Sequence, residues 1–181
     1  MRLFVALELP ADVKASLAEV PEKLKHVGMD AKWIEPGDMH ITLKFLGEVE
    51  DGMLPGVKAG IERAVRDVKP FGVSLEGAGT FGRPPRVVWV GTGKGKEKVT
   101  SLMRNLESGL GFIRKEGREP SPHLTLGRIR SCRDRQSLDM AVEGIAKKAF
   151  GEFTVEEIEL KKSVLTTKGP VYSTVGTFRL G

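Results

Sequence analysis

The sequence predicts an α+β fold: one unit with two similar lobes, each a small sheet backed by helices. Three observations lead to this prediction. Segments of about 15 residues with apolar side chains at three- and four-residue steps alternate with shorter segments typical of strands. The 22 glycines indicate many turns between short strands. The two halves of the chain also have a similar order of helices and strands, and no stretch of disordered composition separates the halves.

In the first half of the chain, each element has a local signal. An apolar run predicts a first strand that Pro10 ends, and a helix starts there and continues to about Lys25. A short extended piece and a turn precede a strand that begins at His40, and a second helix ends before Pro70. These elements cover residues 3–9, 10–25, 33–38, 40–49 and 54–68.

The second half begins with two strands, which a segment rich in glycine and proline, residues 77–85, is expected to separate as a loop. A third helix follows, then a strand that begins at His123, a fourth helix and two closing strands. Their predicted ranges are 71–75, 86–91, 95–110, 123–129, 134–149, 153–165 and 171–178. Residues 1–181 are therefore expected to form a single two-lobed domain.

Composition narrows the class of protein. The net charge of +5 and the sequence pI of about 9.4 favour polyanionic partners such as nucleic acid, although the same charge also serves solubility. The single cysteine, Cys132, excludes an internal disulfide and a cysteine-rich zinc site. The apolar run at the N-terminus is too short for a signal peptide core, and no stretch approaches the roughly 20 apolar residues of a membrane span. We expect a soluble, cytoplasmic protein that does not bind membranes.

Two short motifs carry the chemical information: residues 40–43 (His-Ile-Thr-Leu) and 123–126 (His-Leu-Thr-Leu). Each begins a predicted strand at the corresponding place in its half of the chain. Successive side chains of a strand point to opposite faces, so each motif presents its histidine and threonine together and its two apolar residues on the other face. One such motif is common by chance, but two at matching points indicate a functional site.

Two histidines and two threonines suit the opening of a cyclic phosphodiester. The reaction needs a base for the attacking oxygen and an acid for the leaving oxygen. Histidine has an ordinary pKa of about 6.5, so His40 and His123 can be in different protonation states near neutral pH. Thr42 and Thr125 are placed to donate hydrogen bonds to the charged non-bridging oxygens. This chemistry requires no metal ion.

Other kinds of site fit less well. His40 and His123 could be metal ligands, but no Asp, Glu or Cys stands at ligand spacing beside either of them. A serine nucleophile is disfavoured because the chain has no G-x-S-x-G pattern. His26 is interpreted as a solvated residue at a helix end.

Further segments of the chain match a known family. Beyond the two motifs, these are residues 2–6 (Arg-Leu-Phe-Val-Ala), Trp33, 44–47 (Lys-Phe-Leu-Gly), 85–91 (Pro-Arg-Val-Val-Trp-Val-Gly), Pro122, 127–128 (Gly-Arg) and 169–172 (Gly-Pro-Val-Tyr). With them the chain resembles, over nearly its whole length, the 2′-5′ RNA ligase family. Members of this family are also called RNA 2′,3′-cyclic phosphodiesterases and belong to the two-histidine phosphoesterases.

This resemblance implies a bilobal fold with pseudo-twofold symmetry, mainly antiparallel sheets and an active-site cleft between the lobes. It implies hydrolysis of a terminal RNA 2′,3′-cyclic phosphate to a 2′-phosphate, with no metal and no cofactor. His40 would donate a proton to the leaving 3′ oxygen, and His123 would accept the proton of the attacking water. With an RNA 5′-hydroxyl in place of water, the site would make a 2′-5′ linkage reversibly and without ATP. The expected partner is RNA with 2′,3′-cyclic phosphate ends, tRNA fragments included, and the expected oligomeric state is a monomer.

The resemblance also implies that Phe45, Arg128 and Tyr172 bind the substrate. Phe45 would stack on a base or ribose, Arg128 would hold phosphate, and Tyr172 would reach the cleft. Phe45 and Arg128 each stand five positions after a motif histidine, an odd offset that directs a side chain to the opposite face of a regular strand. Strand twist or a bulge at Gly127 would remove this conflict. The alternatives are a core position for Phe45, a solvated position for Arg128 and a packed strand position for Tyr172.

Other functions remain open from the sequence. The enzyme could act on small cyclic nucleotides or 2′-5′ oligonucleotides, or the protein could bind RNA ends without turnover. Intact histidines in both motifs argue against a binding module. A run of arginines could follow an RNA backbone or form a solvated surface. Its members are Arg128, Arg130, Arg133 and Arg135.

Overall fold

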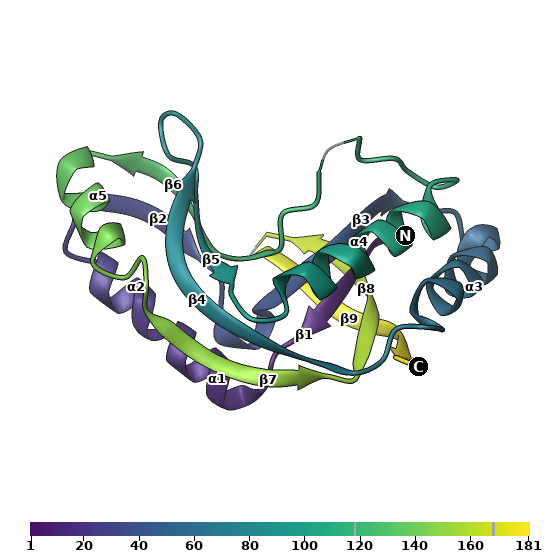
Figure 1. Cartoon of the computed structure of the whole chain (residues 1–181). Helices are drawn as coiled ribbons and strands as arrows, with labels where there is room; N and C mark the ends of the chain where they lie inside the picture. Colours follow the sequence, from purple (N-terminus) through teal and green to yellow (C-terminus); the bar gives the residue numbers. More distant parts are fainter. Residues whose placement is uncertain (118, 168) are drawn as a thin grey trace.

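The computed structural model describes residues 1–117, 119–167 and 169–181. Its strands are β1 (Arg2–Glu8), β2 (Met29–Trp33), β3 (His40–Glu48), β4 (Phe71–Phe81), β5 (Val87–Thr92), β6 (His123–Cys132), β7 (Ala149–Val155), β8 (Glu157–Thr166) and β9 (Gly169–Arg179). Its α-helices are α1 (Ala11–Leu17), α2 (Glu19–Leu24), α3 (Leu54–Val65), α4 (Lys96–Leu110) and α5 (Arg135–Glu143). Within the described residues, the nine strands form one curled antiparallel sheet (Figure 1). The strand order is β7-β4-β5-β6-β3-β1-β8-β9, and β2 pairs with β6 beside this path.

The sheet divides into two lobes that meet where β3 pairs with β6. One lobe holds β3, β1, β8 and β9 with α3 and α4, and the other holds β6, β5, β4 and β7 with α1, α2 and α5 (Figure 1). The predicted α+β fold with two lobes is therefore confirmed, and the two expected sheets are the two ends of one sheet. The lobes do not coincide with the halves of the chain. Helix α1 follows β1 in sequence but packs on β7, and β8 returns to pair with β1.

The core lies on one face of the motif strands. In β1, the side chains of Leu3, Val5 and Leu7 are almost completely buried. The apolar residues of both motifs are buried as well, as the alternation predicted. They are Ile41, Leu43, Leu124 and Leu126. Helix α4 adds buried residues at helical spacing to the same core: Val99, Leu102, Leu106 and Leu110. Burial of these side chains places the histidines of both motifs on the opposite face of β3 and β6, away from the core.

The segment 77–85 is only partly the loop that its glycines predicted. Strand β4 continues to Phe81, and its pairing with β5 shifts register at Gly77, which adopts a φ of +70°. Glycine suits such a bulge because it has no side chain to clash at positive φ. At Gly79, an added Cβ would lie 2.3 Å from Cζ2 of Trp89. These two glycines therefore serve a bulge and a close packing contact inside a strand.

Four other predicted elements differ from the structure. The first helix divides into α1 and α2 at Ala18, because Pro21 has no N–H to donate to the preceding turn. The predicted strand 153–165 is two strands, β7 and β8, which pair with β4 and β1 in different lobes, and the helix before it ends at Glu143. Strand β2 pairs with β6 and begins at Met29, earlier than the expected extended piece. In the part of the chain that the structure describes, no helix has the length and apolar character needed to cross a lipid bilayer.

Candidate active site

The two motif histidines make the same hydrogen bond. His40 Nδ1 donates to the carbonyl oxygen of Asp38 (2.7 Å), and His123 Nδ1 donates to the carbonyl oxygen of Ser121 (2.6 Å). A carbonyl oxygen only accepts, so Nδ1 carries the proton and this bond fixes the tautomer. Neither Nε2 atom has a hydrogen-bond partner among the described residues. Each Nε2 is therefore available to exchange a proton with a substrate.

The central strand pairing brings the two motifs together. β3 and β6 pair at Ile41 and Leu124, which are both fully buried. Extending this register by one residue sets each motif histidine opposite the threonine of the other motif, on the face away from the core. The two histidines are then diagonal neighbours, which in an antiparallel sheet lie roughly 7–8 Å apart. This spacing leaves room for one phosphate group between them.

Bulges bring Phe45 and Arg128 to the same face as the histidines. Leu43 in β3 has no partner residue in β1, and Leu126 in β6 has no partner residue in β5, so each is the extra residue of a β-bulge. Each extra residue reverses the alternation, so a side chain five positions after the histidine shares its face. One bulge lies next to Gly127, where the sequence suggested it. Phe45 is 46% exposed, so a core position for it is wrong.

Aromatic rings surround His40. Its imidazole stacks on Phe4 with ring centroids 5.0 Å apart, and the ring of Tyr172 meets it edge-on at 5.4 Å. Tyr172 also meets Phe4 edge-on at 5.3 Å, and Phe45 lies 6.3 Å from Phe4. The fold thus brings Tyr172, from the last strand of the chain, against the first motif histidine.

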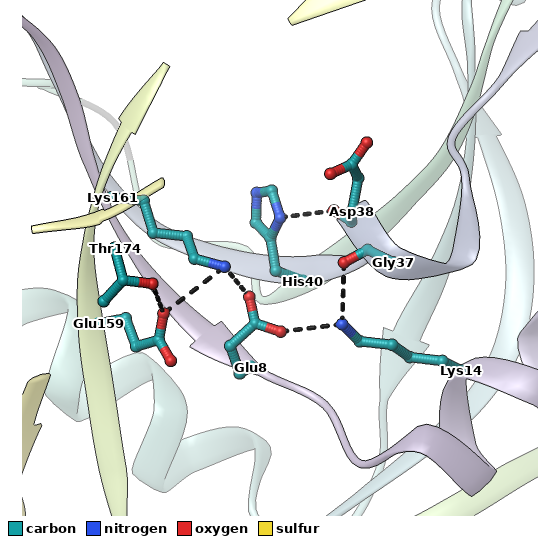
Figure 2. A network of polar contacts seen from close by, with 8 residues as sticks. All are labelled: Glu8, Lys14, Gly37, Asp38, His40, Glu159, Lys161 and Thr174. Carbon is teal, nitrogen blue, oxygen red and sulfur yellow. Dashed lines mark hydrogen bonds and ion pairs between the residues drawn. The ribbon is translucent and has the colours of Figure 1, made fainter. Parts of the chain in front are cut away.

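A network of charged side chains lies beside His40 (Figure 2). Glu8 is the residue of β1 directly opposite His40. Lys14 donates to Glu8 (2.9 Å) and to the carbonyl oxygen of Gly37 (3.1 Å), and Lys161 reaches the same carboxylate from the other side (Figure 2). The carboxylate of Glu8 is therefore held between two ammonium groups. Lys161 also lies 3.6 Å from Glu159, which accepts a hydrogen bond from Thr174 (2.7 Å).

Burial and these charges set the pKa of His40. Burial lowers its pKa below the ordinary value, and the ammonium groups of Lys161 and Lys14 act in the same direction. The carbonyl of Asp38 and the carboxylate of Glu8 oppose this effect. Burial acts against the charge of Glu8, but hydrogen bonds from Lys161 and Lys14 hold its pKa below the ordinary value. Without a substrate, His40 therefore gives up its proton more readily than a solvated histidine.

Tyr172 links the two lobes electrostatically. Burial raises the pKa of Tyr172 and the carboxylate of Asp38 adds to this, whereas the guanidinium of Arg128 opposes it. Tyr172 lies on β9 in one lobe and Arg128 lies on β6 in the other. The charge of Arg128 thus acts at the site that holds His40.

The surroundings of His123 are more open. The residue of β5 directly opposite it is Gly91. The ring of Phe81 meets His123 edge-on at 5.1 Å and stacks on Trp89 at 5.1 Å. His123 lines a cavity of about 430 Å³. The other residues that line it are Glu76, Gly77, Ala78, Phe81, Trp89, Gly91, Thr92, Lys96, Ser121, Pro122, Ala146 and Lys147. One motif histidine is therefore packed among side chains, and the other faces a space of ligand size.

Two other arginines of the run pair with nearby carboxylates. Arg130 pairs with Asp30 (3.8 Å) and Arg135 pairs with Asp139 (2.7 Å), which favours a solvated surface over a continuous RNA track. In residues 1–117, 119–167 and 169–181, no group of three or more His, Cys, Asp or Glu side chains could hold a metal ion. Metal-independent catalysis stays a prediction.

Sequence reasoning missed Phe4, Glu8, Lys161 and Phe81. Phe4 and Glu8 belong to a strand that reads as core, and only the register of β1 with β3 places them beside the motif. Lys161 comes from β8, 153 residues after Glu8 in the sequence. The alternation of polar and apolar residues in 157–161 was the one available signal that Lys161 shares a face with Glu159.

Comparison with known proteins identifies the family. A sequence profile of the 2′-5′ RNA ligase superfamily matches residues 4–165. This chain belongs to that superfamily. An RNA 2′,3′-cyclic phosphodiesterase of Methanothermobacter thermautotrophicus is 34% identical to it and covers 99% of both chains. A protein of the same name from Archaeoglobus fulgidus is 36% identical and covers 98% of this chain and 99% of its own.

Solved structures of similar proteins share the fold. The crystal structure of TT0787 from Thermus thermophilus has a TM-score of 0.82 at 32% identity and covers 99% of this chain and 98% of its own. Apo LigT of Escherichia coli has a TM-score of 0.79 at 23% identity and covers 99% and 96%, a likeness that concerns the fold alone. The two-lobed sheet is thus the architecture expected of this 2′-5′ RNA ligase superfamily member.

Proposed function

We propose that this protein hydrolyses the 2′,3′-cyclic phosphate at the end of an RNA to a 2′-phosphate. In this proposal His40 gives a proton to the leaving oxygen, and His123 takes a proton from the attacking water. The observation that carries the proposal is the matched pair of Nδ1–carbonyl hydrogen bonds on two adjacent strands. Both Nε2 atoms are left without a hydrogen-bond partner among the described residues. The names of relatives at 34–36% identity support the reaction and the substrate.

The proposed mechanism is an in-line displacement at phosphorus. Neutral His123 takes a proton from water at Nε2 while the water oxygen bonds to phosphorus. The bond from phosphorus to the 3′ oxygen breaks, and protonated His40 gives its Nε2 proton to that oxygen. Thr42 and Thr125 donate hydrogen bonds to the non-bridging oxygens as their charge grows. The products are a 2′-phosphate and a 3′-hydroxyl.

The lowered pKa of His40 fits a proton donor that works only with substrate in place. Without substrate, burial and the neighbouring lysines disfavour the imidazolium form. A bound phosphate brings a negative charge beside the ring, and an opposite charge at short range raises the pKa of a histidine. His40 thus gains its proton together with the anion that needs it.

The substrate-binding residues form a separate part of the proposal. Arg128 holds the phosphate, and its exposed position on the histidine face supports this role. Phe45 and Tyr172 offer aromatic surfaces beside His40 for the base or ribose of the terminal nucleotide. We further propose that residues 1–181 act as one two-lobed domain, as a monomer in the cytoplasm, on RNA ends that include tRNA fragments. One continuous sheet and one buried core support the single domain.

A second proposed activity is reversible 2′-5′ ligation without ATP. An RNA 5′-hydroxyl replaces water as the nucleophile, and His123 takes its proton. The family of this chain and the open space beside His123 both favour this second reaction.

The test uses metal-free protein and an oligoribonucleotide that ends in a 2′,3′-cyclic phosphate, with identification of the product end group. We expect a 2′-phosphate from the wild type, unchanged by EDTA, and none from folded His40→Ala or His123→Ala variants. A 3′-phosphate product, or full activity of either variant, would contradict the mechanism. Turnover of 2′,3′-cyclic mononucleotides but not RNA would favour the small-substrate alternative. RNA retention without any product would favour an end-binding module.

A further inference from the structure

The two lobes differ in what stands beside their histidines. Opposite His40 in the sheet is Glu8, whose carboxylate is paired with two lysines, so this side of the site is filled. Opposite His123 is Gly91, and the space above it is part of the 430 Å³ cavity. Pockets of about 300–1,000 Å³ accommodate small organic ligands. The sheet therefore provides an unfilled pocket on the side of the histidine that activates the nucleophile.

Aromatic side chains form one wall of this cavity. Phe81 stacks on Trp89 with an interplanar angle of 23°, and it remains 39% exposed. Gly79 allows this arrangement, because a Cβ there would overlap the Trp89 ring. Trp89 Nε1 is buried and has no hydrogen-bond partner among the described residues. A partly exposed ring supported from behind is the usual platform for a nucleobase.

Charged side chains around the cavity lack partners. Glu76, Lys96 and Lys147 line it, and none of the three makes an ion pair or a side-chain hydrogen bond with another described residue. The charged groups beside His40 are, in contrast, paired with one another (Figure 2). The two ammonium groups outnumber the single carboxylate of Glu76, so the lining keeps a net positive charge that attracts a phosphate. The cavity thus combines a surface for a base with cations for a phosphate.

We propose that this cavity is the binding site for the nucleophilic RNA 5′ end, a nucleoside with a free 5′-hydroxyl and a 3′-phosphate. The inference rests on the proposed function, in which the nucleophile attacks from the side of His123. The base of this nucleoside stacks on Phe81, and its 3′-phosphate lies near Lys96 and Lys147. Its 5′ oxygen bonds to phosphorus and its proton passes to His123, while the 3′ oxygen of the cyclic phosphate leaves with the proton of His40. The product is a 2′-5′ phosphodiester with a free 3′-hydroxyl.

The test measures how one cyclic phosphate is divided between water and a competing alcohol. Cytidine 2′,3′-cyclic phosphate is incubated with adenosine 3′-phosphate, adenosine or methanol, and the ratio of alcohol adduct to cytidine 2′-phosphate is determined. This ratio is independent of the total activity of a variant. In the wild type, we expect the ratio to be highest for adenosine 3′-phosphate and lowest for methanol at equal concentration.

Two substitutions examine the two parts of the pocket. Phe81→Leu keeps an apolar side chain but removes the ring, and we expect the ratio for both adenosine acceptors to fall about tenfold, with methanol unaffected. Phe81→Tyr keeps the ring and should restore the ratio. Lys96→Ala/Lys147→Ala should abolish the preference for adenosine 3′-phosphate over adenosine. The controls are Phe112→Leu, at an aromatic residue 54% exposed outside the cavity, and Lys58→Ala/Lys69→Ala, and both should leave every ratio unchanged.

The outcomes separate this inference from the proposed function. Hydrolysis without any adenosine adduct at saturating acceptor would overturn the inference and leave the hydrolase intact. An unchanged ratio together with a raised KM for the cyclic nucleotide in Phe81→Leu would overturn it too, because the cavity would then hold the cyclic nucleotide itself. No reaction of the cyclic phosphate with any acceptor, water included, would overturn the proposed function and this inference together.

Discussion

Glu8 lies directly opposite His40 across the β1–β3 ladder, and its ionised carboxylate is held between Lys14 and Lys161. The carboxylate and the two lysines act in opposite directions on the pKa of His40. Burial is the largest cause of the lowered pKa of His40, and Glu8 opposes it through charge alone, without a hydrogen bond to the ring.

Replacing Glu8 by glutamine removes this charge and keeps the side-chain volume. Because the carboxylate raises the pKa of His40 and the lysines lower it, we expect this pKa to fall in Glu8→Gln. An acid must be protonated, so kcat/KM decreases as pH rises through its pKa, and this decrease should move to lower pH. NMR titration of the His40 ring and the pH–rate profile measure both effects.

The matched control for Glu8→Gln is Glu159→Gln, which removes a carboxylate 3.6 Å from Lys161 but not one opposite His40. We expect a smaller change in the pKa of His40. An equal shift in both variants, or none in Glu8→Gln, would show that the position of Glu8 has no special effect.

The threonine hydroxyls are expected to stabilise the transition state. Thr42→Val and Thr125→Val keep the shape of the side chain and remove the donor, and each should lower kcat about 100-fold with little change in KM. Serine at either position retains the hydroxyl and should recover most of the rate. Steady-state kinetics with a 2′,3′-cyclic nucleotide provide the comparison. A loss in KM alone would make the threonines binding residues without a role in the chemical step.

Substitution of Arg128 or Arg130 by alanine removes one positive charge in either case, so the two variants can be compared at the same net charge. Arg128 shares the histidine face, whereas Arg130 pairs with Asp30. Loss of a charge-assisted hydrogen bond to phosphate should raise KM about tenfold in Arg128→Ala. Arg130→Ala should have little effect on KM at the same ionic strength. Equal effects of the two substitutions would mean that only general charge attraction is involved.

An ion pair between a buried lysine and a partly exposed glutamate lies at the middle of the motif strand β3. Lys44 is 2% exposed and pairs with Glu107, and this pair holds the pKa of Glu107 below its ordinary value. Glu107→Gln leaves the ammonium group buried without a counter-ion and should lower the free energy of unfolding by about 2–3 kcal/mol, since Glu107 is partly exposed. Lys44→Met/Glu107→Gln should be more stable than Glu107→Gln alone. Urea denaturation of the wild type and the two variants provides the test, and a double variant no more stable than Glu107→Gln would contradict a coupled pair.

The parts of the site that were predictable are those with a local signal. Alternation within each motif predicted that histidine and threonine share a face and that Ile41 and Leu124 enter the core. The bulges at Leu43 and Leu126 have no such signal, because they depend on which neighbouring strand residue is skipped. Only the glycine after the second bulge suggested one of them.

The order of elements in the sequence did not predict which strands and helices form each lobe. The chain repeats its pattern in two halves, but the first helices pack on the lobe built mostly from later strands. The cross-strand neighbours of the histidines, Glu8 and Gly91, depend on register between distant segments. For this reason the charge network at one histidine and the cavity at the other emerged only from the structure.

The central claim is that His40 is the acid and His123 the base. The most direct measurement replaces the leaving 3′ oxygen by sulfur in a nucleoside 2′-O,3′-S-cyclic phosphorothiolate, because a thiolate leaves without a proton. Sulfur at this position should restore most of the rate that His40→Ala loses, and it should leave His123→Ala as inactive as before. Restoration of His123→Ala instead would reverse the two roles, and restoration of neither variant would contradict acid catalysis at the leaving oxygen.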